Sequence, residues 1–218
     1  MRSDEDLGLS ENEETDFTGT MSAYNSFSGH ERNHLFVNVG GRFQDVSGVS
    51  GLDSPADGRV FGLLDYDRDG QLDIAVGNAN APLSALYHNR FAETVSGKNG
   101  NVIALRFVGG NDGPSASEWS ARDAYGTQVR VSLGDRVLLR EHRCGEGLAA
   151  QNSATMLIGI GDVSAGGVTV RFPSGRERAV GQVAAGSLVT VWENPEQVDI
   201  ENGIRTEPYF RDIVVPGR

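Results

Sequence analysis

The spacing of short apolar runs constrains the fold of this chain more than any other feature. Residues 128–133 alternate strictly, with Val129, Val131 and Leu133 on one face, and Gly134-Asp135 follows as a two-residue hairpin turn. Such runs recur roughly every 8–12 residues with glycine turns between them, and no segment has a convincing helical period. We therefore predict an all-β chain that contains a sandwich or barrel-like domain.

The expected strands form two groups. The first group lies at 35–39, 42–46, 60–64, 74–76 and 85–89, with Gly40-Gly41 as a hairpin turn. The second group lies at 102–108, 128–133, 137–140, 157–160, 168–172 and 189–192, with a polar loop at 109–125. Residues 194–218 are expected to be a surface tail or an added edge strand, with a late apolar group at Ile213-Val214-Val215.

An acidic loop separates two strands of the first group. Asp65, Asp67, Asp69 and Asp73 fall within nine residues, and Gly70 offers the positive φ of a sharp turn. These carboxylates, with the backbone carbonyl of Gln71, can form an all-oxygen cage of the kind that Ca²⁺ prefers. We predict a calcium site at these five residues.

The loop matches only the first half of an EF-hand loop. Val76 stands where that motif needs a bidentate glutamate, and the flanks are expected strands rather than helices. The alternative is an acidic hairpin whose aspartates bond only their own backbone as Asx-turns.

Composition excludes several classes of function. The 218 residues carry 30 acidic and 19 basic side chains, a net charge of −11, which argues against nucleic acid as a partner. No apolar run approaches the ~20 residues of a membrane span. Cys144 is the single cysteine, so no internal disulfide and no CxxC metal or redox site can form.

The chain divides into four expected segments. Residues 1–20 read as a disordered acidic arm without an apolar signal-peptide core, and 21–95 hold the first strand group with the calcium loop. Residues 96–193 form the second β domain, and 194–218 the C-terminal tail.

The first group resembles an FG-GAP/VCBS repeat. The resemblance rests on residues 33–38, 41–46, the Asp65–Asp73 loop and Leu86-Tyr87-His88-Asn89. It implies a strand segment like one blade of a β-propeller, with a calcium-binding hairpin loop. One blade cannot close a ring, so we expect it to pack on the second domain or to complete a propeller in a longer chain.

The second group resembles the ASPIC/UnbV domain of cartilage acidic protein-like chains. The matching pieces are residues 122–129, Gly145-Glu146-Gly147, 150–153, 158–161 and 170–175. The two resemblances cover about residues 30–193 and imply a secreted or cell-surface protein.

We therefore expect a calcium-binding, non-enzymatic recognition or adhesion module with a protein or glycan ligand. His142 and Cys144 would share a face of a strand, but no third group completes a catalytic set, and His88 reads as a surface or hairpin residue. The alternatives are a structural spacer without a ligand, or an accessory domain of a carbohydrate-active enzyme.

Overall fold

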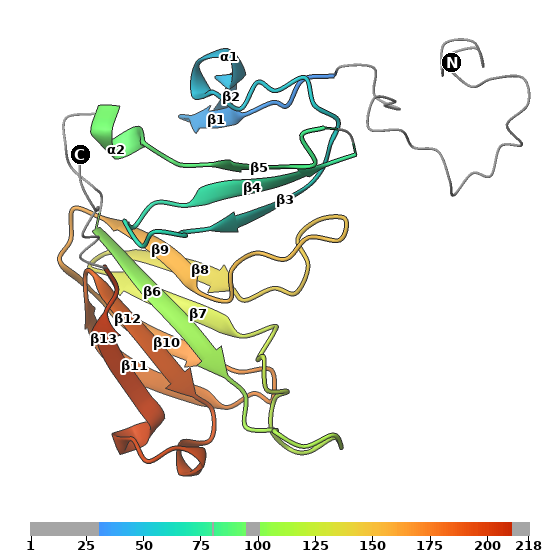
Figure 1. Ribbon diagram of the computed structural model, residues 1–218. Helices are drawn as coiled ribbons and strands as arrows, with labels where there is room; N and C mark the ends of the chain where they lie inside the picture. Colours follow the sequence, from blue (N-terminus) through green and yellow to red (C-terminus); the bar gives the residue numbers. More distant parts are fainter. Residues whose placement is uncertain (1–30, 80, 95–100, 211–218) are drawn as a thin grey trace, which may run out of the picture. The chain divides into compact units, whose positions relative to one another are not determined.

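The computed structural model describes residues 31–79, 81–94 and 101–210, and its regular structure is almost entirely β (Figure 1). The all-β prediction is therefore confirmed. The chain divides into two compact units, a smaller one of Met1–Phe61 with Ala75–Tyr87 and a larger one of Gly62–Ile74 with His88–Arg218. The four segments expected from the sequence stay a prediction.

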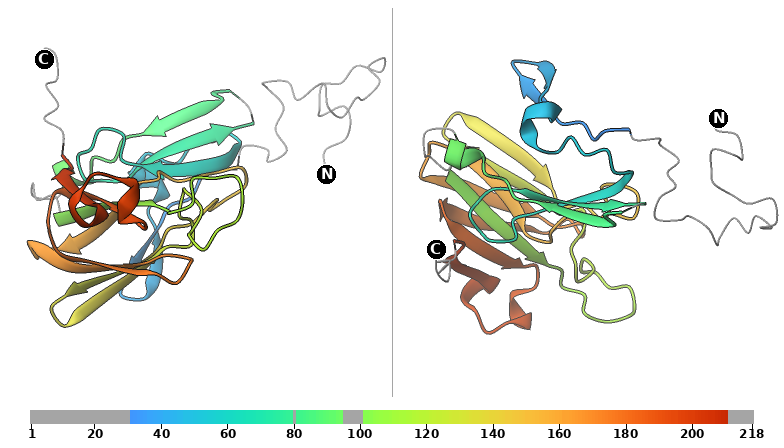
Figure 2. Two further views of the ribbon diagram at one scale, coloured as in Figure 1. Left: turned by 90° about the horizontal axis from the view of Figure 1, so that it is seen from below. Right: turned by 45° about the horizontal axis from the view of Figure 1, so that its top comes forward.

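The larger unit contains two four-stranded sheets that enclose one core (Figures 1 and 2). One sheet has the order β11 (Glu177–Ala184), β10 (Ala165–Arg171), β7 (Gln128–Leu133) and β8 (Arg136–Glu141). The other has the order β13 (Ile204–Pro208), β12 (Ser187–Trp192), β6 (Asn101–Val108) and β9 (Met156–Gly161). Neighbouring strands are antiparallel except β6 and β12, which are parallel.

Alternation along the strands builds the core of this sandwich. Every second residue of β7 is buried, as the sequence pattern predicted, and Val168 and Val170 of β10 face the same interior. Ile103 and Leu105 of β6 close the core from the opposite sheet and are completely buried. Burial of these apolar side chains is the main stabilising contribution to the unit.

Strand β6 is also buried on its second face. Val102 and Ala104 form a smaller cluster there with Leu188 and Tyr209, and Leu157 packs against it. Residues beyond the two sheets must therefore cover this outer face, since a strand of a two-sheet sandwich otherwise exposes one side.

The smaller unit contains a hairpin of β1 (Phe36–Val39) and β2 (Arg42–Asp45), turning at Gly40-Gly41. Helix α1 (Ser47–Ser50) follows, and β3 (Gly58–Leu64), β4 (Asp73–Asn78) and β5 (Ser84–Tyr87) form a three-stranded sheet in that order. The inner ends of β3 and β4 belong to the larger unit, as does α2 (Phe91–Thr94). Among the described residues, no helix has the length and apolar character needed to cross a membrane.

One strand, β11, and the short helices depart from the sequence prediction. No strand was expected between Gly175 and Val189, which was wrong: β11 lies there, but a bulge with Gly181 at φ 87° interrupts its alternation. The edge-strand alternative for the C-terminal segment is realised by β13, which pairs with β12. The apolar group at 213–215 lies outside the described residues.

A buried carboxylate connects several segments at one end of the sandwich by hydrogen bonds. Glu193, only 1% exposed, follows β12 and accepts hydrogen bonds from the backbone N–H groups of Gly110 and Ser120, both at 2.8 Å. The hydroxyls of Ser120 and Ser174 donate to its other oxygen. Although burial alone raises the pKa of Glu193, these hydrogen bonds outweigh it and hold the pKa below its ordinary value.

Replacing Glu193 by alanine should lower the free energy of unfolding by about 3 kcal/mol, because buried donors would lose their acceptor. Urea denaturation measures the effect. Glu177→Ala, at an exposed position of β11, is the control and should cost less than about 1 kcal/mol. Equal losses of unfolding free energy in the two variants would contradict a stabilising role of the Glu193 hydrogen bonds.

His142 makes the stability of the larger unit depend on pH. Its ring is buried between Tyr125, at 4.9 Å between centroids, and Phe107, at 5.4 Å. Burial lowers the pKa of His142 below its ordinary value of 6.5, although the backbone and charge of Asp123 oppose this shift.

The folded chain therefore binds fewer protons at His142 than the unfolded chain does. Stability from this group is fully present above pH 6.5 and should fall as the pH is lowered from there towards the folded pKa. Melting temperatures between pH 7.5 and 5 measure the slope, which His142→Gln should reduce. An unchanged slope in His142→Gln would contradict this assignment.

Candidate metal centre

The acidic loop joins β3 to β4 and lies in the larger unit. It turns at Arg68, with φ 61°, and at Gly70, with φ 92°, so the positive φ predicted for Gly70 is confirmed. A side chain at Gly70 would also collide, since its Cβ would lie 2.9 Å from the Phe210 ring and 3.3 Å from Val102 Cγ2. Glycine is therefore required here by conformation and by space.

Backbone N–H groups inside the loop satisfy part of the carboxylate charge. Asp65 accepts from the N–H of Asp69 at 3.1 Å and of Gly70 at 2.9 Å. Asp67 accepts from Asp69 N at 3.3 Å, and Asp69 accepts from Gln71 N at 2.8 Å. The last two are Asx-turns, so the alternative interpretation of the sequence describes real contacts here.

Asp73 holds the end of the loop and is completely buried. One oxygen accepts from the Tyr66 N–H at 3.1 Å, and the other from the Asn89 N–H at 2.8 Å. This carboxylate joins the loop to the segment that follows β5. It therefore has a structural role whether or not a cation binds.

The carboxylates converge rather than spread into solvent. Ligand atoms of Asp65, Asp67 and Asp73 all lie within 4.8 Å of one another, and those of Asp67, Asp69 and His88 form a second group by the same measure. Asp67 belongs to both groups. Gln71 lies against Asp69, to which its side-chain amide donates at 3.2 Å.

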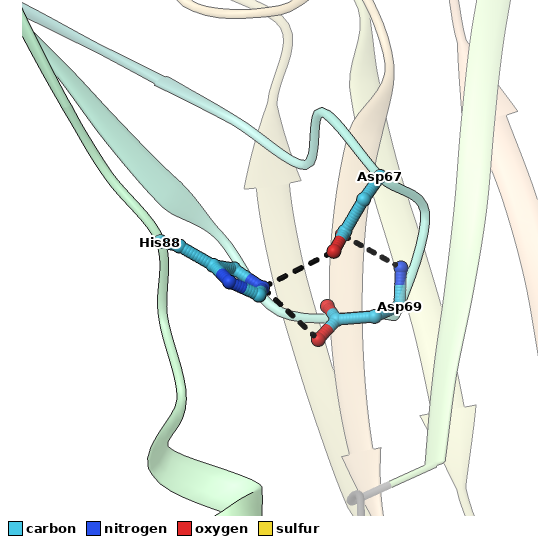
Figure 3. A group of neighbouring side chains, drawn as sticks. All are labelled: Asp67, Asp69 and His88. Atoms are coloured by element: carbon cyan, nitrogen blue, oxygen red, sulfur yellow. Dashed lines mark hydrogen bonds and ion pairs between the residues drawn. The ribbon is translucent and has the colours of Figure 1, made fainter. Parts of the chain in front are cut away.

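Figure 3 shows the imidazole of His88 turned towards Asp67 and Asp69. His88 Nε2 lies 3.1 Å from an oxygen of Asp67 and 3.9 Å from one of Asp69. At 36% side-chain exposure, His88 is a surface residue as the sequence suggested, but its contact with the acidic loop was not predicted. The sequence analysis placed His88 inside the expected strand 85–89, whereas in the structure it directly follows β5, the neighbour of the strand that starts at Asp73.

The electrostatics of the loop reflect crowded negative charge. Burial raises the pKa of Asp69, and the carboxylates of Asp67 and Asp65 raise it further, while hydrogen bonds from Gln71 oppose the shift. Like charges at such separations favour either a proton or a cation between them. The arrangement can thus hold a cation chemically, through carboxylate oxygens that already point inward.

Three residues far along the chain contact the loop or the strand that leads into it. The Tyr209 hydroxyl donates to Asp65 Oδ2 at 2.8 Å. Asn152 Oδ1 accepts from the N–H of Leu63 at 2.8 Å, and the Ser153 N–H donates to the Leu63 carbonyl at 2.9 Å. Leu63 belongs to β3, the strand that leads into the loop. Nothing local in the sequence indicated Tyr209.

The other candidate pair does not form. His142 is buried against Tyr125 and Phe107, whereas Cys144 is exposed. Among the described residues, therefore, these two side chains do not present a shared nucleophile and base.

The fold and site define a β-sandwich domain that carries an acidic loop on the outer face of one sheet. Residues 117–198 match a family model described as ASPIC and UnbV. This range contains β7 to β12 and includes Asn152. The ASPIC/UnbV resemblance is thus supported, while the FG-GAP/VCBS resemblance stays a prediction.

Two curated proteins are similar to this chain. It is 39% identical over 99 residues to cartilage acidic protein 1 of Mus musculus, a match covering 41% of this chain and 15% of that protein. It is 43% identical over 67 residues to cartilage acidic protein 1 of Homo sapiens, covering 29% and 10%. The chain thus spans a small part of the length of these relatives.

With a metal chelator present, replacing Asp73 or Asp67 by asparagine should change the free energy of unfolding by different amounts. Asp73→Asn should lower the free energy of unfolding by about 2 kcal/mol, because an amide cannot accept from both Tyr66 and Asn89. Asp67→Asn keeps one acceptor oxygen and removes a like charge, so its change should stay below about 1 kcal/mol. Urea denaturation with EDTA compares them, and a larger loss for Asp67→Asn would contradict the geometry.

Proposed function

We propose that this chain is a calcium-binding, non-enzymatic recognition module of an extracellular protein. One observation carries the proposal: three carboxylates from the two ends of one loop have ligand atoms within 4.8 Å of one another. Asp65, Asp67 and Asp73 would bind the cation directly, with Asp69 and the Gln71 carbonyl as the remaining protein ligands.

The donor chemistry favours calcium. Ca²⁺ takes six to eight oxygens in flexible geometry, whereas Mg²⁺ requires a small octahedron and keeps several waters. The loop offers carboxylates on a turn, and the bound ion would neutralise their repulsion. Its hydrogen bonds from Asp69 N and Gly70 N to Asp65 leave that carboxylate already oriented.

His88 offers the main alternative in metal chemistry. An imidazole nitrogen beside carboxylates suits transition metals better than calcium. His88 makes its closest contact with Asp67, a member of the oxygen cluster, so the two kinds of metal would compete for one carboxylate. Titration with Mn²⁺ and Zn²⁺ beside Ca²⁺ therefore belongs to the test.

We favour recognition over catalysis because the loop would use its carboxylates as metal ligands. A cage that uses its carboxylates as ligands has no free general base, and His142 and Cys144 do not form a catalytic pair. The relatives' name places those proteins in cartilage and calls them acidic, and this chain carries a net charge of −11. We extend an extracellular setting to this chain on that similarity.

The smaller unit fits a propeller-blade-like repeat. Its strands are short, and Phe36 and Phe43 of the β1–β2 hairpin are 55% and 72% exposed. Apolar side chains at such positions are typical of a surface that packs against a further element. A partner protein or glycan ligand would bind such a module in a calcium-dependent way.

Calcium should raise the melting temperature of the protein. At a free concentration one hundred times the Kd, the stabilisation would be about 2.7 kcal/mol. Scanning calorimetry with Ca²⁺, Mg²⁺, Mn²⁺, Zn²⁺ or EGTA measures it, and calcium should give the largest shift among these ions.

A matched variant shows whether the loop is responsible. Asp67→Asn should lose most of the calcium shift, while Asp123→Asn, an exposed aspartate of the larger unit, should retain it. Identical melting curves with calcium and EGTA, together with no heat of binding, would refute the proposed calcium site. A larger shift with Mn²⁺ or Zn²⁺, lost in His88→Ala, would reassign the metal.

A glycan array probed with and without calcium tests the recognition role. Binding that requires calcium and is lost in Asp67→Asn would support it. No binding to any glycan in either condition would leave a protein ligand or the spacer role as the remaining explanations of the module.

A further inference from the structure

We propose that metal binding at the acidic loop is coupled to the docking of the C-terminal strand β13, and that Tyr209 is the positioning residue that couples them. This inference rests on the proposed metal-binding function of the loop. It concerns how occupancy of the site is transmitted to a segment more than 130 residues away along the chain.

Tyr209 joins the two elements by a directed contact. Its hydroxyl donates to Asp65 Oδ2 at 2.8 Å, and the same oxygen accepts from the Gly70 N–H at 2.9 Å. With one oxygen fixed by two donors, the carboxylate is held in a single orientation, and its ligand atom stays in the group with Asp67 and Asp73. A hydrogen bond to a carboxylate is stronger than one between neutral groups.

The ring and the backbone of Tyr209 are also fixed by contacts within the larger unit. The residue is 3% exposed and belongs to the cluster on the outer face of β6. Its N–H donates to the Gly186 carbonyl at 2.8 Å, directly after β13 pairs with β12. The guanidinium of Arg68, in the acidic loop, lies 5.9 Å from the centre of the ring.

Phe210 adds a second contact between the same elements. A Cβ at Gly70 would lie 2.9 Å from one edge of its ring, and a Cβ at Gly186 would lie 2.8 Å from another. The ring thus fits between the acidic loop and the turn before β12. Both glycines have positive φ, so loop and turn are shaped to receive it.

These contacts predict an energetic link between loop and strand. An undocked β13 would remove the Tyr209 hydroxyl from Asp65 and leave that carboxylate with its two donors inside the loop, and a disordered loop would expose Tyr209. A cation that binds the ordered loop must therefore favour the docked strand, and the docked strand must favour the cation by the same factor. The coupling can be measured either as a change in the docking of β13 or as a change in the calcium affinity of the loop.

Amide hydrogen exchange of residues 204–207 and 209 in the wild-type protein, measured with Ca²⁺ and with EGTA, shows how calcium affects the docking of β13. Calcium should slow exchange of the Tyr209 amide and of the β13 ladder by about fivefold or more. Exchange in β8, an edge strand of the opposite sheet, should change much less. This comparison needs no substitution.

The Tyr209→Phe variant tests whether Tyr209 affects calcium binding at the acidic loop. It keeps the buried ring and removes the hydroxyl, so the calcium Kd from calorimetry should rise about 5–10-fold. The calcium-dependent slowing of exchange in β13 should then largely disappear. Tyr125→Phe removes a hydroxyl from a ring that stacks on His142 elsewhere in the sandwich, and it should leave the Kd unchanged.

The outcomes separate the two claims. Calcium binding by the wild type without slower exchange in β13, or with the same Kd in Tyr209→Phe, overturns the coupling and leaves the proposed site standing. A wild-type protein that binds no metal overturns both. Slower exchange in β13 with a weakened Kd in Tyr209→Phe, but not in Tyr125→Phe, supports the coupling.

Discussion

Strand β6 has two apolar faces, and this constraint arranges much of the larger unit. Ile103 and Leu105 point into the sandwich, while Ala104 and Val102 point out of it, and all four are buried. A two-sheet sandwich covers only the first pair. Tyr209 covers the second pair from the C-terminal side, and the turn at Gly70 reaches Val102. The acidic loop is therefore part of the packing of the domain rather than an appendage to it.

The sequence predicted those parts of the structure that depend on neighbours in the chain. Strict alternation in β7 identified its buried face, and the spacing of aspartates around Gly70 identified a turn with converging carboxylates. The bulge at Gly181 concealed β11, because an extra residue shifts the period on which the prediction relied. The local sequence pattern was sufficient to predict a strand and its buried face where the period of two was unbroken.

The supporting contacts of the loop could not be predicted in this way. Tyr209 lies 144 residues from Asp65, and Asn152 lies 89 residues from Leu63. Only the pairing of β13 with β12 and the return of the 143–153 segment bring them to the loop.

The carboxylate of Glu193 and the carboxylates of the acidic loop are stabilised in different ways. Glu193 is alone, and its two oxygens accept from two N–H groups and two hydroxyls, so its charge is met entirely by protein donors. In the acidic loop, backbone donors and Tyr209 serve four carboxylates that also repel one another.

Hydrogen bonds can orient these four groups, but neutral donors do not remove their net charge. His88 can offset part of it only when protonated. A divalent cation would remove the repulsion while using the same orientation, and for this reason the loop, unlike Glu193, is interpreted as a binding site.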